Sequence, residues 1–228
     1  MRIVALLWVA ILLLLGPLNI VLTRRVSARR FPTRMGAYSG TVRGLAALGL
    51  LTLLVDAAGA RQAIHALLKV SPVPALVAWT VATFLACVTV SFAALCLRKL
   101  RRLRVSPLVG LLLPETPRER AAFLGVSLTA GLVEEYVMRG FTLLTLVSWI
   151  RSPILALVLV SLSFGIAHGY QDWIGMARAT LLGALLAVPV LLTGALLPAV
   201  IVHALVDAIA GLPSYRSLMN RWQLLPAA

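Results

Sequence analysis

The chain has 228 residues, of which 61% are hydrophobic and only 12% are charged, and its net charge is +14. A soluble core does not need so large an apolar fraction, and repeated long apolar runs are typical of transmembrane helices. The composition therefore predicts an all-α, polytopic membrane protein. The positive charge does not indicate nucleic-acid binding, because the basic residues cluster between apolar runs and no recognition motif accompanies them.

The apolar runs predict a transmembrane bundle of about seven helices, and six to eight are possible if the segment Pro107–Pro117 re-enters the bilayer. Otherwise this segment is expected to be a loop or to lie on the surface. Ser71–Pro74 is expected to be a loop because neither proline fits well inside a helix, and Pro198 is expected to interrupt the last span. The predicted spans are Ile3–Leu22, Gly44–Ala60, Ala75–Leu97, Ala121–Ile150, Pro153–His168, Met176–Thr193 and Leu196–Leu212.

The basic residues predict the orientation of this bundle. With the first, third and fifth loops and the C-terminal tail on one side, that side holds sixteen Lys and Arg residues against four on the other. Such a bias predicts an N-terminus outside and a C-terminus in the cytoplasm. A basic cluster rather than a cleavage site follows the first span, which indicates a retained helix. The Ala-, Leu- and Arg-rich composition suggests an integral protein of a bacterial cytoplasmic (inner) membrane.

The fourth span contains three ionisable residues, Glu134, Glu135 and Arg139, in otherwise apolar surroundings. A charge at bilayer depth costs about 2.5–3.5 kcal/mol on insertion scales, so such residues indicate a functional site. Glu135 and Arg139 are four residues apart and share one helix face, whereas Glu134 points about 100° away from Glu135. We expect Glu135 to neutralise Arg139 and Glu134 to face another group. A purely structural polar cluster is the alternative.

Further ionisable residues lie in the later spans. His168 ends the fifth span, and His203 and Asp207 share one face of the seventh because they are four residues apart. Each has a simpler structural interpretation, namely an interfacial histidine or a self-satisfied pair. Bundles nevertheless bury such groups against one another, so Glu134, His168, His203 and Asp207 are expected to converge on one water-accessible cavity.

These motifs resemble those of the CPBP intramembrane protease family. The order is Glu134-Glu135-x-x-x-Arg139, then Phe164-x-x-x-His168, then His203-x-x-x-Asp207. The family includes CAAX prenyl endopeptidases and bacterial Abi-like proteins linked to bacteriocin processing or self-immunity. The first three spans lie outside the resemblance. The resemblance implies three parts of the chain: N-terminal helices and basic loops (1–119), a catalytic helical core (120–212) and a C-terminal tail (213–228).

The resemblance implies an intramembrane endopeptidase that cleaves a membrane-associated protein or peptide within the lipid bilayer. It implies that Glu134 activates water with the help of His168, and that His203 stabilises the oxyanion with Asp207 beside it. The expected supporting residues are Glu135, Arg139 and Phe164. Prenyl-protein-processing members usually have Asn in place of Asp207, so Asp207 must be protonated, orient His203 or bind a metal.

Both the use of a cofactor and the function have more than one interpretation. The favoured interpretation needs no cofactor, since no His-Glu-x-x-His helix is present. The alternative is a divalent metal such as zinc, whose possible ligands are Glu134, His168, His203 and Asp207. The alternative functions are a non-catalytic bacteriocin-immunity protein that neutralises a peptide toxin, and a proton-coupled transporter. We see no repeated, Gly- or Pro-interrupted halves of the kind that indicate transport.

Overall fold

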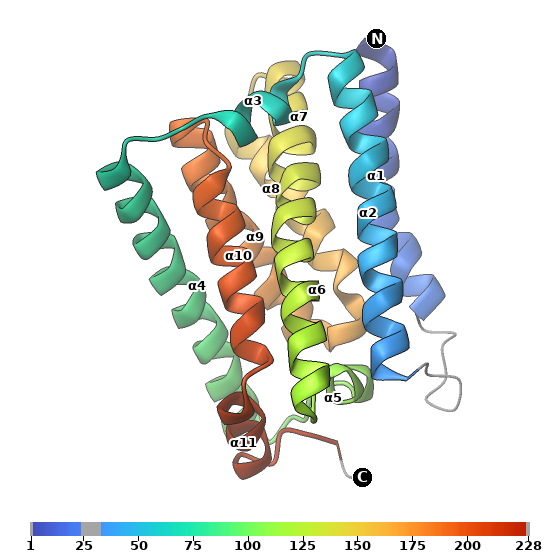
Figure 1. The fold of residues 1–228 in the computed structure, drawn as a ribbon, viewed down its shortest axis with the longest axis vertical. Helices are drawn as coiled ribbons and strands as arrows, with labels where there is room; N and C mark the ends of the chain where they lie inside the picture. The colour runs from blue at the N-terminus through green and yellow to red at the C-terminus, as the bar shows by residue number, and fades with distance from the viewer. Residues whose placement is uncertain (1, 24–32, 227–228) are drawn as a thin grey trace.

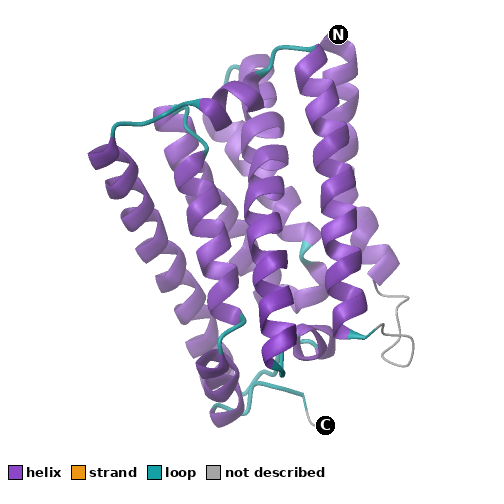
Figure 2. Cartoon of the chain, in the orientation of Figure 1, coloured by secondary structure: helices purple, strands orange, loops and turns teal. Residues whose placement is uncertain are grey.

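A computed structural model describes residues 2–23 and 33–226, and within these ranges the regular secondary structure is entirely helical (Figures 1 and 2). The all-α fold predicted from composition is therefore confirmed. Four arginines of the first predicted loop, namely Arg24, Arg25, Arg29 and Arg30, lie outside the described residues. The elements in chain order are α1 (Arg2–Thr23), α2 (Arg34–Ala58), α3 (Gln62–Leu68), α4 (Val73–Arg101), α5 (Pro107–Leu112), α6 (Pro117–Glu135), η2 (Tyr136–Leu143), α7 (Leu144–Ile150), α8 (Pro153–Ala167), η3 (Gly169–Gln171), α9 (Asp172–Thr193), α10 (Leu197–Ala210) and α11 (Pro213–Arg221).

The long helices form two layers (Figure 1). In the front layer α10 packs between α4 and α6, and α2 packs on the other side of α6. Behind it, α8 packs between α9 and α1, and α9 also contacts α4 and α10. The two ends of the drawn chain lie at opposite ends of the bundle. Helices α6, α8 and α10, which carry the predicted site residues, therefore come from both layers.

Within residues 2–23 and 33–226, four helical segments are long and apolar enough to cross a membrane: Arg34–Ala58, Val73–Arg101, Pro117–Ile150 and Gly169–Thr193. A fifth span results if Leu197–Ala210 and Pro213–Arg221, which are bent by 57°, are taken together. Ile3–Leu15 and Pro153–Ala167 are apolar but shorter. These helices indicate an integral membrane protein. The count of seven spans and the orientation stay predictions.

The outside of the bundle is apolar. Large hydrophobic side chains on α2, α4 and α6 are exposed, among them Leu54, Leu85 and Leu128. Exposed side chains of this kind would be unfavourable in water but are at home against acyl chains. The core holds a different set of residues, such as Val137, Leu143 and Val202, which are almost inaccessible.

The structure moves several predicted helix boundaries, and proline explains two of them. Val73 begins α4, so Pro74 lies in the first turn rather than in a loop, and Pro198 likewise lies in the first turn of α10 without interrupting it. The first turn tolerates proline because its N–H groups have no helical partner there. Within Pro107–Pro117, residues Pro107–Leu112 form the short helix α5.

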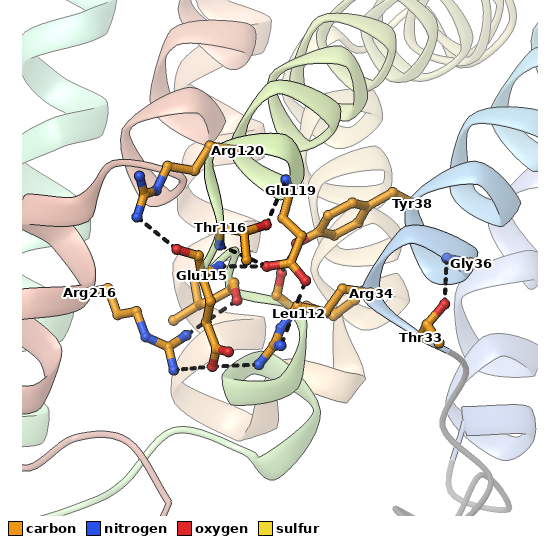
Figure 3. A network of polar contacts seen from close by, with 11 residues as sticks. Thr33, Arg34, Gly36, Tyr38, Leu112, Glu115, Thr116, Glu119, Arg120 and Arg216 are labelled. Atoms are coloured by element: carbon orange, nitrogen blue, oxygen red, sulfur yellow. Dashed lines mark hydrogen bonds and ion pairs between the residues drawn. The ribbon is translucent and has the colours of Figure 1, made fainter.

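A network of charged residues joins α2, the α5–α6 connection and α11 at one end of the bundle (Figure 3). Glu115 accepts hydrogen bonds from Arg34 at 2.7 Å and from Arg216 at 2.6 Å. Glu119 and Thr116 form a reciprocal capping box at the start of α6. The network fixes the start of α6, the helix that leads to the two adjacent glutamates.

Helix α8 is short, and His168 directly follows its last residue. Its 15 residues span about 22 Å, which is less than the roughly 30 Å of a hydrocarbon core. Helix α8 also packs closely on α9, because a Cβ atom on Gly165 would overlap Thr180 Oγ1 and lie 2.8 Å from the Met176 carbonyl oxygen. A glycine is therefore required at this contact.

We predict that Gly165→Ala destabilises the protein by about 1–3 kcal/mol, the usual cost of overpacking, because the Met176 backbone cannot yield as a side chain can. Thermal unfolding of the purified protein in detergent measures this loss. Gly125→Ala on α6 is the matched control, since a Cβ there meets nothing within 4 Å. An equal effect of the two substitutions would contradict the close α8–α9 contact.

Candidate active site

The two adjacent glutamates lie at the end of α6, where the helix changes its geometry. Glu135 is the last residue of α6, and Tyr136–Leu143 form a π-helix. The Thr142 hydroxyl donates to the Val137 carbonyl oxygen, five residues earlier, at 2.8 Å. Such π-helical turns are rare and are frequent at functional sites. The sequence analysis did not predict this turn, which contains Arg139.

Glu135 is fully buried and holds two helices together. Its Oε1 atom accepts a hydrogen bond from Arg139 Nη1 at 2.7 Å and lies 2.7 Å from Nδ1 of His203 on α10. The ion pair with Arg139 is the one expected from their spacing. The contact with His203 was not predicted, since sequence spacing says nothing about which helix lies opposite. A carboxylate only accepts, so His203 Nδ1 carries a proton and donates it.

With Nδ1 occupied, the other ring nitrogen of His203 faces two further carboxylates. Nε2 lies 3.5 Å from Asp207 Oδ2 and 3.9 Å from Glu134 Oε2. The Glu134 side chain is 24% exposed and that of Asp207 is 40% exposed, whereas that of Glu135 is 0% exposed. The first two carboxylates are therefore partly exposed at the protein surface, whereas the third is buried.

Phe164 lies between the two histidines and the arginine. Its ring centroid is 4.5 Å from that of His168 and 6.0 Å from that of His203, and the Arg139 guanidinium lies over the ring at 4.3 Å. This last contact is a cation–π interaction. Phe164 is itself buried. It therefore keeps the three polar side chains at fixed positions around one aromatic ring.

His168 follows α8 and is oriented by the backbone of that helix. Its Nδ1 atom lies 2.8 Å from the Phe164 carbonyl oxygen. A carbonyl oxygen only accepts, so Nδ1 carries the proton and Nε2 is left free for the site. His168 is within electrostatic range of Glu134, His203 and Asp207. The four predicted residues of the site are thus brought into one region.

The connection after His168 is held in place by a buried arginine. Arg98 of α4 donates to both carboxylate oxygens of Asp172, at 2.7 and 3.0 Å, and to the Arg104 carbonyl oxygen. Asp172 in turn accepts from the backbone N–H groups of Ile174 and Gly175 at the start of α9. Bidentate pairs of this kind fix direction as well as distance.

Five of the seven acidic residues of the chain have structural partners among the described residues. These pairs are Asp56 with Tyr136 and the start of α3, Glu115 with Arg34 and Arg216, Glu119 with Thr116 and Arg34, Glu135 with Arg139 and His203, and Asp172 with Arg98. The other two, Glu134 and Asp207, have His203 Nε2 as their ion-pair partner.

The described residues contain no group of three or more His, Cys, Asp or Glu side chains that could hold a metal ion. The proposed ligands, Glu134, His168, His203 and Asp207, therefore do not form a ready metal site in this arrangement.

Comparison with known proteins identifies a family for part of the chain. Residues 116–209 match the family model described as type II CAAX prenyl endopeptidase Rce1-like. The matched range contains the motifs from Glu134 to Asp207, and it confirms the resemblance found in the sequence. Comparisons with curated proteins and with solved structures gave no match.

We predict that Arg139→Met lowers the free energy of unfolding by about 3–5 kcal/mol, because it leaves the buried Glu135 carboxylate without its cation. The double variant Arg139→Met with Glu135→Gln should recover much of this loss, since the amide still accepts from His203. Thermal unfolding in detergent tests both variants. Arg34→Met is the control, as partly exposed pairs contribute about 1 kcal/mol or less. Simple additivity of the two substitutions would contradict the prediction.

Proposed function

We propose that this chain, which carries an Rce1-like domain of the type II CAAX prenyl endopeptidase family over residues 116–209, is an intramembrane endopeptidase that uses Glu134 as its general base. One observation carries the proposal. Glu134 and Asp207 are the two acidic residues whose ion-pair contact among the described residues is only the long one to His203 Nε2, at 3.9 and 3.5 Å, and both side chains are partly exposed. Ionisable groups placed in this way inside a membrane protein indicate a functional site.

In the proposed reaction Glu134 takes a proton from a water molecule, and the water oxygen attacks the carbonyl carbon of the scissile peptide bond. His168 assists through Nε2, which its bond to the Phe164 carbonyl leaves free. The carbon–nitrogen bond then breaks, and Glu134 returns the proton to the leaving amine. General acid–base catalysis of this kind contributes about 10²–10⁴-fold to a rate.

His203 is proposed to stabilise the oxyanion as an imidazolium, whose Nδ1–H donates to Glu135 and whose Nε2–H turns from Asp207 to the oxyanion. Glu135 fixes the ring by accepting from Nδ1, in the way that a buried carboxylate orients a catalytic histidine in other hydrolases. Asp207 lies 3.5 Å from Nε2 and is proposed to orient the same nitrogen. Glu135 and Arg139 are buried and bonded to each other, which supports a positioning role for them.

The substrate is proposed to be a membrane-associated protein or peptide. The matched family is named for CAAX prenyl endopeptidases, so a prenylated CAAX peptide belongs among the candidates, together with acylated and transmembrane peptides. We also propose that this Rce1-like region forms the catalytic core and that the helices before it form a supporting bundle. Positive charge at the predicted inner side suggests that the site is reached from the cytoplasm.

We predict that Glu134→Gln and His168→Ala each lower cleavage by about 10²–10⁴-fold without loss of folding. The assay incubates the purified protein in nanodiscs with a pool of prenylated, acylated and transmembrane peptides and detects new fragments by mass spectrometry. His65→Ala is the matched control, because its side chain is exposed and makes no contact with the predicted site residues among the contacts described above. Undiminished cleavage by Glu134→Gln would exclude the proposed base. Toxin protection or solute uptake without cleavage would favour the immunity or transport alternatives.

A separate prediction concerns Asp207. If it orients His203, Asp207→Asn should stay within about tenfold of the wild type, because an amide oxygen also accepts from Nε2–H. Asp207→Ala should lose about 10²–10³-fold, the range found for groups that serve an oxyanion hole. Initial cleavage rates of the same peptide pool measure both variants. Equal losses in the two variants would show that the negative charge itself is required.

A further inference from the structure

Arg178 is a cation inside a membrane-spanning segment. The positive-inside count assigned it to the fifth loop although it lies in the predicted span Met176–Thr193, and the structure likewise has it within α9 (Asp172–Thr193), in the apolar segment Gly169–Thr193. It lies about two turns beyond the start of the helix. An arginine at this depth is costly, and such residues face the bundle interior and have a partner there.

The side chain of Arg178 contacts helix α4 and the residue that precedes α9. Its Nη2 atom donates to Gln171 Oε1 at 3.4 Å, and Nη1 donates to Ser91 Oγ of α4 at 3.4 Å. The Gln171 amide donates to the Tyr170 hydroxyl, and the Tyr170 ring centroid is 5.9 Å from that of His168. A chain of contacts thus leads from Arg178 to the histidine.

Arg178 also lies within electrostatic range of Asp207, the outermost carboxylate of the site. Arg178 and Asp207 are nonetheless not an ion pair, because the ion-pair partner of Asp207 within 4 Å is His203. The ion pairs of the other described acidic residues do not include Arg178 either. Both hydrogen bonds of Arg178 are long, neutral contacts. The guanidinium is therefore placed beside the site without an anion to neutralise it.

We infer that Arg178 binds a carboxylate of the substrate and so selects peptides that carry this group within a few residues of the scissile bond. This inference rests on the proposed function. The planar fork of a guanidinium matches a carboxylate in a bidentate way, and such charge-assisted pairs are strong where water is scarce. Two sources have this chemistry, namely the free C-terminus of the substrate and an Asp or Glu side chain near the cleaved bond.

The position of Arg178 favours a substrate over a lipid as the source of the anion. Its contacts lie between α4 and α9 and toward Tyr170, so the charge faces into the protein rather than toward the headgroups. A lipid phosphate would remain at the membrane surface, where long basic side chains reach by extending outward.

The test uses one pool of lipid-anchored peptides that carry randomised C-terminal segments. It compares the cleavage of two forms of this pool, one with free C-terminal acids and one with C-terminal amides. We expect the wild type to cleave its preferred acid peptides about 10- to 100-fold better in kcat/KM than their amides, if the chain end is the anion. If a side chain is the anion, both forms are cleaved and the cleaved peptides are enriched in Asp or Glu near the bond. Either result supports a carboxylate site.

The variants assign this selectivity to Arg178. Arg178→Gln should abolish the preference by lowering only the cleavage of carboxylate-bearing peptides, while Arg178→Lys should retain part of it because it keeps the charge without the fork. Arg43→Gln, which removes an exposed arginine of α2, should behave as the wild type. Binding of the same peptides to each variant in a Glu134→Gln background, measured by tryptophan fluorescence, should follow the same order independently of turnover.

Three results would overturn the inference. Equal cleavage of peptides with and without carboxylates by the wild type would show that there is no such selectivity. An equal loss of cleavage rate on all peptides in Arg178→Gln would show a structural role. A dependence of the Arg178→Gln effect on anionic phospholipid rather than on the peptide would assign the residue to the membrane. Absence of cleavage of any peptide by the wild type would instead reject the proposed function, and the inference with it.

Discussion

The structure depends on one buried carboxylate with two partners. Glu135 holds Arg139 within its own helical segment and His203 on the neighbouring α10, both at 2.7 Å. In an apolar bundle such a carboxylate cannot remain without a cation or a donor, because no solvent compensates its charge. The interaction therefore fixes the register of α6 against α10. It also decides which nitrogen of His203 is left to face the exposed carboxylates of Glu134 and Asp207.

The side chains around Glu135 differ in how tightly they are held. Arg139 lies over Phe164, and the Phe164 backbone carbonyl orients His168, so one residue of α8 supports two parts of the site. Glu134 and Asp207 are held less tightly, with their closest ion-pair distances at 3.9 and 3.5 Å. Catalytic contacts are often long before the substrate is bound and shorten in the complex. The site thus combines a buried, tightly bonded set of side chains with two partly exposed acids.

The sequence predicted several features of the site because they are local. The four-residue spacing of Glu135 and Arg139, and of His203 and Asp207, places each pair on one helix face whatever the surrounding fold. The scarcity of acids in apolar helices likewise marked Glu134 as a candidate. Arg178 could have been found in the same way, since it is a single charge in an apolar run. It was missed because it was counted with the loop before α9.

By itself, the sequence determined that the chain is a bundle of membrane helices and that the order of its polar motifs resembles that of a protease family, because composition and motif order need no contacts. The tertiary structure decided which helices meet, and with them that Glu135 rather than Glu134 binds His203, that a π-helix follows the two glutamates, and that Arg178 contacts α4 and the residue that precedes α9. The physical reason is that lipid-facing and protein-facing side chains are equally apolar in sequence. Their hydrophobicity therefore cannot tell which face of a helix packs against another.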